Sequence, residues 1–593
     1  MAVYRSDQAQ LTIAAEAAPG GDPELNSGSR HTGGFNGLIN NASGIAAGST
    51  QIVYDNGSNT LYKGDFIRIG NVNAGSSESS SDADGSTVNE YEIRRVVHFT
   101  GTTAGTIFLD RPTAFFHANN EILINVEGSS ATEEFNYITT VPGIYEGVTL
   151  PEFTPTIEPR YLLGTSADRN FTIAYSGSQS FNGALSSFVV VDASPLRFPI
   201  GKMTTVPSSV ASDSIKLDGA VKKGDLFIDC DGSDVGNLAV NDYIQIVNAD
   251  GTTTTSEVRQ IVDEPGTDIF RLDKPLRFDH ADNSDIHEVS GGASPSGTFT
   301  HTITETFDLD TLSWNVLFRD TAETAANDLQ RRYVGGIVDS ATLSASEGGM
   351  LMMSYDSVPF LDMIHNQANQ STLGNNLYAD GGGSEDAGMP RYSMMNSIDT
   401  TDISFPSTEP YYFSQGSFKL FGQEFARVRS VSISMANSVE PRYYISPRHG
   451  RHRGPSEFRE GRRSYSMACT VALPDTIQSI DESGTADETV NSANEIFKQV
   501  LLEGNYADGN GLKGFNIELT FTRGTNDTIQ ILIPNDYTSG DETTGAGTGL
   551  NEAGAFILSA PYNITGDPII QADLDILFRN MKIEIVDTKP SYI

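Results

Sequence analysis

A basic segment within a strongly acidic chain is the feature whose residue types most clearly suggest chemistry. It contains seven arginines and two histidines: Arg442, Arg448, His449, Arg451, His452, Arg453, Arg459, Arg462 and Arg463. An arginine side chain can hold a carboxylate through two parallel hydrogen bonds, so the segment predicts ion pairs with a neighbouring copy of the chain. Two alternatives stay open at this point. The segment is a solvated loop paired within its own subunit, or it contacts DNA.

The histidines offer a second set of candidates. His449 and His452 are three residues apart, but they lie in a loop rich in Gly, Pro and Arg, and we expect no metal there. His117 and His280 occupy equivalent positions in two copies of one sequence repeat. We expect a shared structural contact at these two positions.

Acidic and glycine-rich segments are weaker candidates. Asp82-Ala83-Asp84-Gly85 has the start of a calcium loop, but Tyr91 stands where the glutamate of an EF-hand belongs, so that pattern fails. Gly545–Gly549 lacks the strand–helix context of a phosphate loop. Three aspartates are expected to be ordinary turn residues rather than a cation site: Asp229, Asp231 and Asp234. With no hydrolase or zinc-protease spacing in the chain, we expect no enzyme activity, cofactor or metal.

The repeat that carries the two histidines defines a module. The first copy contains Leu61–Ile69, Tyr91–Val97 and Leu109–Ala118, and the second contains Leu238–Ile246, Ser256–Val262 and Leu272–Ala281 in the same order. Each copy predicts short strands in a small barrel or sandwich. The first copy has an extra polar segment, residues 75–85, which is expected to be a flexible loop tip.

The charge of the chain is extreme. It has 77 acidic residues against 38 basic ones, a net charge of −39, and only 11 of the basic residues are lysines. The acid is spread along the chain, as in proteins from molar salt, where the Debye length is about 3 Å and surface carboxylates barely repel one another. We therefore expect a halophilic source, and a basic partner is the alternative. Two cysteines exclude a disulfide scaffold, and Cys469 is expected to be buried.

No segment suggests a membrane or secretion. Residues Met1–Asp7 lack the apolar stretch of a signal peptide, and no apolar run approaches the roughly 18 residues of a membrane helix. We expect a protein made in a cytoplasm, with no membrane partner.

Outside the modules, period-two alternation predicts the strands of a β-rich body. The predicted strands are 431–435, 465–473, 515–521, 529–533, 574–578 and 581–585. The two segments on either side of Gly524 are expected to form a hairpin, and the last two to form a closing pair. One helix is predicted between the capping box Ser492/Glu495 and Gly504.

The order of several short segments in this body carries a resemblance to a known family. These segments are Gly143–Gly147, Tyr161–Gly164, Phe171–Tyr175, Phe181–Gly183, Pro195–Gly201, Tyr333–Leu343, Gly348–Gly349 and Val428–Met435. With the helix–hairpin end, they resemble the major tail tube protein of long-tailed, siphovirus-like viruses over residues 140–205 and 295–593. The two modules and residues 368–407 depart from that pattern.

The resemblance implies a mainly β fold, a tail-tube β-sandwich or barrel with one flanking α-helix, to which the two duplicated β modules are added. It implies hexameric rings that stack into a tube in the virion, assembled in the host cytoplasm. Viral DNA would pass through the lumen without specific binding. The expected partners are other copies of the chain and the tape measure, terminator and distal tail proteins. Together with the charge, it suggests a virus of a haloarchaeon.

These expectations divide the chain into five parts. They are an N-terminal arm or linker at 1–44, module copy 1 at 45–126, a first body part at 127–205, inserted module copy 2 at 206–294, and the rest of the body at 295–593. Both modules are expected to project outward from the ring. The alternative function is that of a glycan-binding or adhesion protein of a virion or cell surface.

Overall fold

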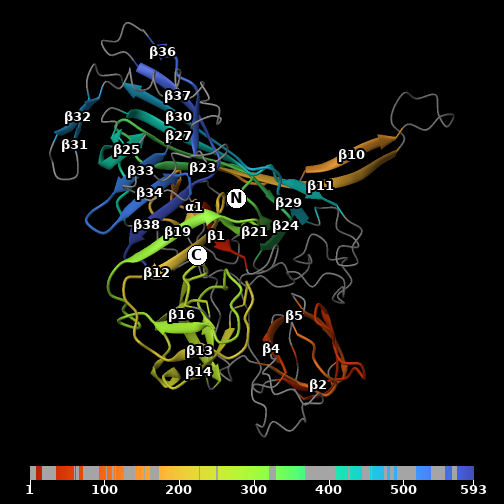
Figure 1. Ribbon diagram of the computed structural model, residues 1–593. Helices are drawn as coiled ribbons and strands as arrows, with labels where there is room; N and C mark the ends of the chain where they lie inside the picture. The colour runs from red at the N-terminus through yellow and green to blue at the C-terminus, as the bar shows by residue number, and fades with distance from the viewer. Residues whose placement is uncertain are drawn as a thin grey trace, which may run out of the picture.

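The computed structural model shows a two-sheet body that carries two small barrels (Figure 1). The structure describes residues 9–592 with breaks. The breaks fall at 17–34, 59–60, 62–65, 71–91, 102, 110–112, 114, 126–140, 146, 152–153, 161–172, 226, 249–250, 267, 319–328, 368–407, 421–422, 425–427, 444–454, 456, 473–476, 481–485, 491–515, 536–553 and 564–570. The mainly β class predicted from the sequence is confirmed.

The larger sheet of the body has eleven strands. Its main path runs β10-β11-β23-β22-β27-β30-β37-β35, while β8 and β9 pair with β11 and β36 pairs with β37. The strands are β8 Ile144–Tyr145, β9 Val148–Thr149, β10 Thr154–Arg160, β11 Ile173–Val189, β22 Ser340–Ser346, β23 Met352–Phe360, β27 Val428–Ala436, β30 Ser464–Ala472, β35 Ala555–Ser559, β36 Tyr562–Asn563 and β37 Gln571–Phe578.

The smaller sheet has seven strands and closes the other side of the core. In spatial order they are β12 Gly201–Pro207, β19 Phe299–Glu305, β38 Lys582–Asp587, β34 Thr528–Ile533, β33 Ile517–Thr522, β25 Gly416–Leu420 and β26 Gln423–Glu424. Buried side chains from both sheets, among them Ile433, Met467, Ile531 and Ile583, belong to one continuous core. The body is therefore a β-sandwich.

Smaller elements surround the sandwich. A four-stranded sheet contains β1 Ala9–Ala15, β20 Leu312–Phe318, β21 Leu329–Gly336 and β24 Asp362–Gln367. Two ribbons pair β28 Glu440–Arg442 with β29 Glu457–Arg459, and β31 Ile477–Ile480 with β32 Ala486–Val490. The helical elements in the described ranges include α1 Ser194–Arg197, η2 Val235–Asn237 and η5 Phe413–Gln415.

The repeated modules are closed barrels with the same strand order. The first contains β2 Asn36–Ile39, β3 Gln51–Ser58, β4 Phe66–Ile69, β5 Glu92–Thr100, β6 Gly105–Leu109 and β7 Ile122–Asn125. The second contains β13 Ile215–Leu217, β14 Phe227–Gly232, β15 Tyr243–Ile246, β16 Glu257–Gly266, β17 Ile269–Leu272 and β18 Asp285–Glu288. Closure leaves neither barrel with a free sheet edge.

The second barrel is inserted between two strands that are hydrogen-bonded neighbours. The last residue of β12, Pro207, lies opposite the first residue of β19, Phe299, so the chain leaves and re-enters the sheet at one point. The barrel also covers the free edge of β12: the Thr205 amide donates to the Ser256 carbonyl at 2.9 Å, and the Ser256 hydroxyl donates to the Thr205 carbonyl at 2.6 Å. An insertion at such a site leaves the sheet intact.

The alternating segments predicted from the sequence are strands in the structure, but one predicted pairing is wrong. The hairpin of β33 and β34 forms, with Ile517 opposite Ile533. The expected closing pair does not form, because β37 pairs with β30 in the larger sheet and β38 pairs with β19 and β34 in the smaller one. Alternation identifies the buried face of a strand and leaves its partner undetermined.

The segment predicted as an N-terminal arm, 1–44, contains two strands. β1 pairs with β20 of the body, and β2 belongs to the first barrel, which therefore starts at Asn36 rather than at residue 45. Four other predictions lie outside the described residues: the helix at 492–504, the loop at 75–85, the glycine cluster at 545–549 and the region 368–407.

Candidate functional site

On the outward face of the larger sheet, the central strands carry almost only small side chains, whereas β37 beside them carries Asp573, Asp575 and the exposed Leu577. In its three central strands the inward residues are buried in the core, and the residues between them point away from it. These outward residues are Ser340, Thr342, Ser344 and Ser346 on β22, Ser430, Ser432, Ser434 and Ala436 on β27, and Ser464, Ser466, Ala468 and Thr470 on β30. Ten of the twelve carry a hydroxyl group, and we call the set the serine face.

Strand register places these residues in rows across the sheet. One row runs through Thr342, Ser434 and Ser466, and the next through Ser344, Ser432 and Ala468. Because neighbouring strands lie about 4.8 Å apart, each row is a continuous line of short polar side chains. The sequence signal was the alternating serine in β22, β27 and β30. The alternation predicts the buried residues of β27 and β30, but the serines between them were not recognised as a candidate site.

Acidic residues flank the serine face. Asp356 accepts hydrogen bonds from Thr342 at 2.9 Å and from Ser354 at 2.7 Å. On the other flank, Asp573 accepts one from Thr470 at 2.8 Å, and Asp575 lies on the next strand opposite Ala468. The twelve residues of the face include no lysine or arginine.

Serine is a poor strand former, and nothing inside the sandwich requires it at these outward positions. What the face provides is low relief, hydration through its hydroxyl groups and no positive charge. A surface of this kind can lie beside a moving solute without binding it.

A two-stranded ribbon extends the larger sheet beyond the body (Figure 1). Residues 181–189 of β11 pair with β23, β8 and β9, whereas residues 173–180 pair with β10. In the described part of the chain, no third strand joins the outer half. An isolated two-stranded ribbon is marginally stable in water, so this one is suited to packing against another molecule. Pro155 and Pro159 limit further pairing along β10.

The structure places only part of the basic segment. Arg442 on β28 bonds Glu440 at 2.7 Å, and Arg459 on β29 bonds Glu457 at 2.7 Å. Arg463 bonds Glu460 at 2.9 Å, and Arg462 is exposed. Ion pairs of this kind, formed within one subunit, are what the solvated-loop alternative predicts. The other members lie outside the described residues: Arg448, His449, Arg451, His452 and Arg453.

The two equivalent histidines make the expected shared contact. In the first barrel, His117 Nε2 lies 2.7 Å from Glu92 Oε1, and Glu92 also pairs with Arg94. In the second barrel, His280 Nε2 lies 2.7 Å from Glu257 Oε1, and Glu257 also pairs with Arg259. These side chains are buried, and each cluster stabilises the fold around it; Arg94 also lies 3.6 Å from Asp225 of the second module.

The clusters of the two barrels differ in charge balance. Burial opposes the charged form of His117, but hydrogen bonds to Glu121 and Glu92 raise its pKa to about 9. In the second barrel, burial alone would raise the pKa of Glu257, but Arg259 and His280 lower it to about 2.

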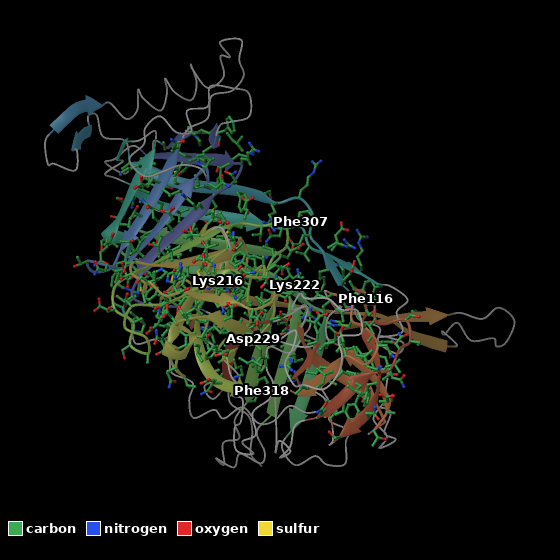
Figure 2. All side chains as sticks on the ribbon, turned by 60° about the horizontal axis from the view of Figure 1, so that its bottom comes forward. Phe116, Lys216, Lys222, Asp229, Phe307 and Phe318 are labelled. Atoms are coloured by element: carbon green, nitrogen blue, oxygen red, sulfur yellow. The ribbon has the colours of Figure 1, made fainter. Side chains whose placement is uncertain are left out.

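The predicted turn aspartates lie on the second barrel, which also carries Lys216 and Lys222 (Figure 2). The turn prediction is wrong for Asp229 and Asp231, which lie on β14, Asp229 buried; Asp234 accepts the Ser214 amide at 2.8 Å. Within the described ranges, no three His, Cys, Asp or Glu side chains are grouped to hold a metal ion.

Both cysteines are buried and free, and burial raises the pKa of the Cys469 thiol to about 12. None of the helices in the described segments has the length and apolar character needed to cross a membrane. A search of protein families and of curated proteins finds no match to the chain.

Proposed function

We propose that this chain is a structural, non-enzymatic subunit of a viral tail tube, in which the serine face lines the conduit for DNA. The observation that carries the proposal is the serine face itself. A chain of net charge −39 presents on the central strands of its largest sheet twelve small side chains without lysine or arginine, and the exposed Arg429 beside them on β27 is paired with Glu347 at 3.0 Å.

The chemistry of DNA explains why such a face suits a conduit. Lysine and arginine bind phosphates and would slow a passing duplex. Apolar side chains would expose to water a surface that favours aggregation. Serine hydroxyls stay hydrated and carry no charge, while Asp356, Asp573 and Asp575 at the flanks repel phosphates weakly.

Assembly into stacked rings is the second part of the proposal. A ring subunit needs surfaces that different neighbours cover, and head-to-tail stacking requires two unlike faces. The β10–β11 ribbon offers one such surface, because its outer half lacks a third strand in the described part of the chain. By resemblance, we propose hexameric rings in the virion of a halophilic archaeal virus, with tape measure, terminator and distal tail proteins as partners.

The position of the second barrel is consistent with a conduit at the serine face. It is inserted at β12 and β19, in the smaller sheet, whereas the serine face belongs to the outer surface of the larger sheet. The barrel and the serine face are thus attached to opposite layers of the sandwich. We propose that both barrels project outward while the serine face turns to the lumen.

Electron microscopy of the purified protein in molar salt tests the assembly. We expect rings or tubes with a central channel. Monomers at every salt concentration would contradict the proposal.

Cysteine labelling tests which face lines the channel. The native thiols are buried, so Ser466→Cys on the serine face and Ser233→Cys on the surface of the second barrel each introduce one reactive thiol. In assembled tubes, we expect a small maleimide to reach both sites and a polymer-linked maleimide too large for the channel to reach only Ser233→Cys. Equal labelling of both by the large reagent would place the serine face outside.

A further inference from the structure

Three arginines are buried where the second barrel meets the body. Arg197 ends α1, Arg259 lies on β16, and Arg277 follows β17; their exposed fractions are 0%, 2% and 6%. Burying one guanidinium group is costly unless it is fully paired, and three in one place raise that cost.

The hydrogen bonds of this cluster leave donors unused. Arg197 Nη1 bonds Asp310 Oδ2 at 2.5 Å, but within the described residues its Nε and Nη2 have no partner. Arg259 bonds Glu257 and donates to the Val258 carbonyl at 2.8 Å, while its Nε is likewise unpartnered. A buried donor without a partner costs about 1–3 kcal/mol, and more when it is charged.

The charges of the cluster also point to a missing negative partner. The pKa of Arg277 is held well below its usual value by burial and by repulsion from Arg197 and Arg259, which Asp310 and Glu257 oppose. Arg277 Nη2 donates to the Tyr592 carbonyl at 2.6 Å, a neutral acceptor. Lys223 shares Asp310 at 3.0 Å. Among the described residues, the carboxylates hydrogen-bonded to these three arginines are Asp310 and Glu257, so the arginines outnumber them.

We propose that this junction binds one small monovalent anion, chloride in a saline medium, held by the unpartnered N–H groups of Arg197 and Arg259. A buried water molecule could accept the same hydrogen bonds, but it would not neutralise the excess charge. The donor atoms are buried, so the ligand must shed its hydration shell, which favours chloride over sulfate or phosphate. The inference rests on the junction alone and is independent of the proposed tube.

The bound anion stabilises the junction by mass action. Above its dissociation constant, a single site raises the folding equilibrium constant about tenfold for each tenfold rise in chloride. General screening of the surface charge lacks this dependence on one kind of anion.

A thermal unfolding series on the full-length protein tests the site. Sodium chloride replaces sodium gluconate at constant ionic strength, and we expect the midpoint of the wild type to rise as chloride increases. Arg197→Met removes two of the three unpartnered donors and leaves only the Arg259 Nε, so its midpoint should respond to chloride much less than that of the wild type. The matched control is Arg523→Met: Arg523 is paired with Asp527 at 2.7 Å, so this variant should lose stability and keep the chloride response.

A crystal of the wild type soaked in bromide gives a direct readout that does not depend on a variant's folding. We expect an anomalous peak within hydrogen-bond distance of Arg197 and Arg259. Absence of the peak, or an equal chloride response in Arg197→Met and the wild type, would overturn the inference and leave water as the occupant.

Discussion

At the scale of single residues, the two barrels contain the same buried cluster with one changed acid. His117 Nδ1 lies 2.7 Å from Glu121, whereas the residue four positions after His280 is Ser284. Within the described residues, His280 Nδ1 and the Ser284 hydroxyl have no partner. His117 thus has a carboxylate at each ring nitrogen, a geometry in which the doubly protonated imidazolium donates two hydrogen bonds.

This difference predicts how the stability of the first barrel depends on pH. The pKa of His117 is raised from 6.5 to about 9, so its contribution is fully present below pH 6.5 and is lost as pH rises through 9. A shift of this size corresponds to about 3 kcal/mol. We would digest the full-length protein by pulse proteolysis in urea. The region that forms the first barrel, residues 36–125, should become less resistant to cleavage as the pH rises from 7 to 10.

The control for this prediction gives the first barrel the serine that the second barrel has at the equivalent position. Glu121→Ser removes one of the two carboxylates, so the loss of resistance should start at a lower pH. An unchanged pH profile in Glu121→Ser would mean that Glu121 does not stabilise the imidazolium.

At the scale of elements, the sequence determines faces better than partners. Alternation of Tyr465, Met467 and Cys469 marks the inward side of β30, and all three are buried as expected. The same logic applied to β37 and β38 gave a wrong pairing, because two strands on opposite walls of one core have the same pattern as two neighbours.

Sequence reasoning found the repeat and its histidines because both copies lie in one chain and can be compared. The proposed anion site could not be predicted from the sequence, because Arg197 and Arg259 are 62 positions apart and belong to different parts of the fold. The serine face could be predicted only in part from the sequence. Its residues were visible in each strand, but the rows appear only once the register of β22, β27 and β30 is known.

The β10–β11 ribbon carries the element-scale prediction. Replacing residues 154–180 with a short Gly-Ser linker should leave the urea midpoint of the monomer unchanged, because within the described residues the outer ribbon pairs only with itself. Assembly should fail, since a surface needed by the neighbouring subunit is gone. Sedimentation in molar salt measures this as at least a tenfold rise in the concentration needed for tubes.

The control for the ribbon variant is the same linker in place of residues 75–85 of the first barrel, which should assemble as the wild type does. A ribbon variant that still forms tubes at wild-type concentration would show that the ribbon is not part of the interface.

At the scale of the whole molecule, the net charge should control the assembly that we propose. Each subunit carries −39, and a ring of six would bring together six times that charge. Like charges at about 10 Å repel strongly near 0.1 M salt and weakly near 1 M, where the Debye length falls to about 3 Å. The concentration of protein needed for tubes should therefore fall steeply as salt rises from about 0.1 M to above 1 M.

Anion identity separates this long-range effect from the proposed buried site. Screening depends on ionic strength, so light scattering should show the same onset of assembly in sodium gluconate and in sodium chloride at equal ionic strength. The thermal midpoint of the subunit should instead follow chloride through Arg197 and Arg259. If assembly also required chloride at constant ionic strength, the chloride-stabilised position of the second barrel would be needed for contacts between subunits. The barrels would then take part in the ring interface.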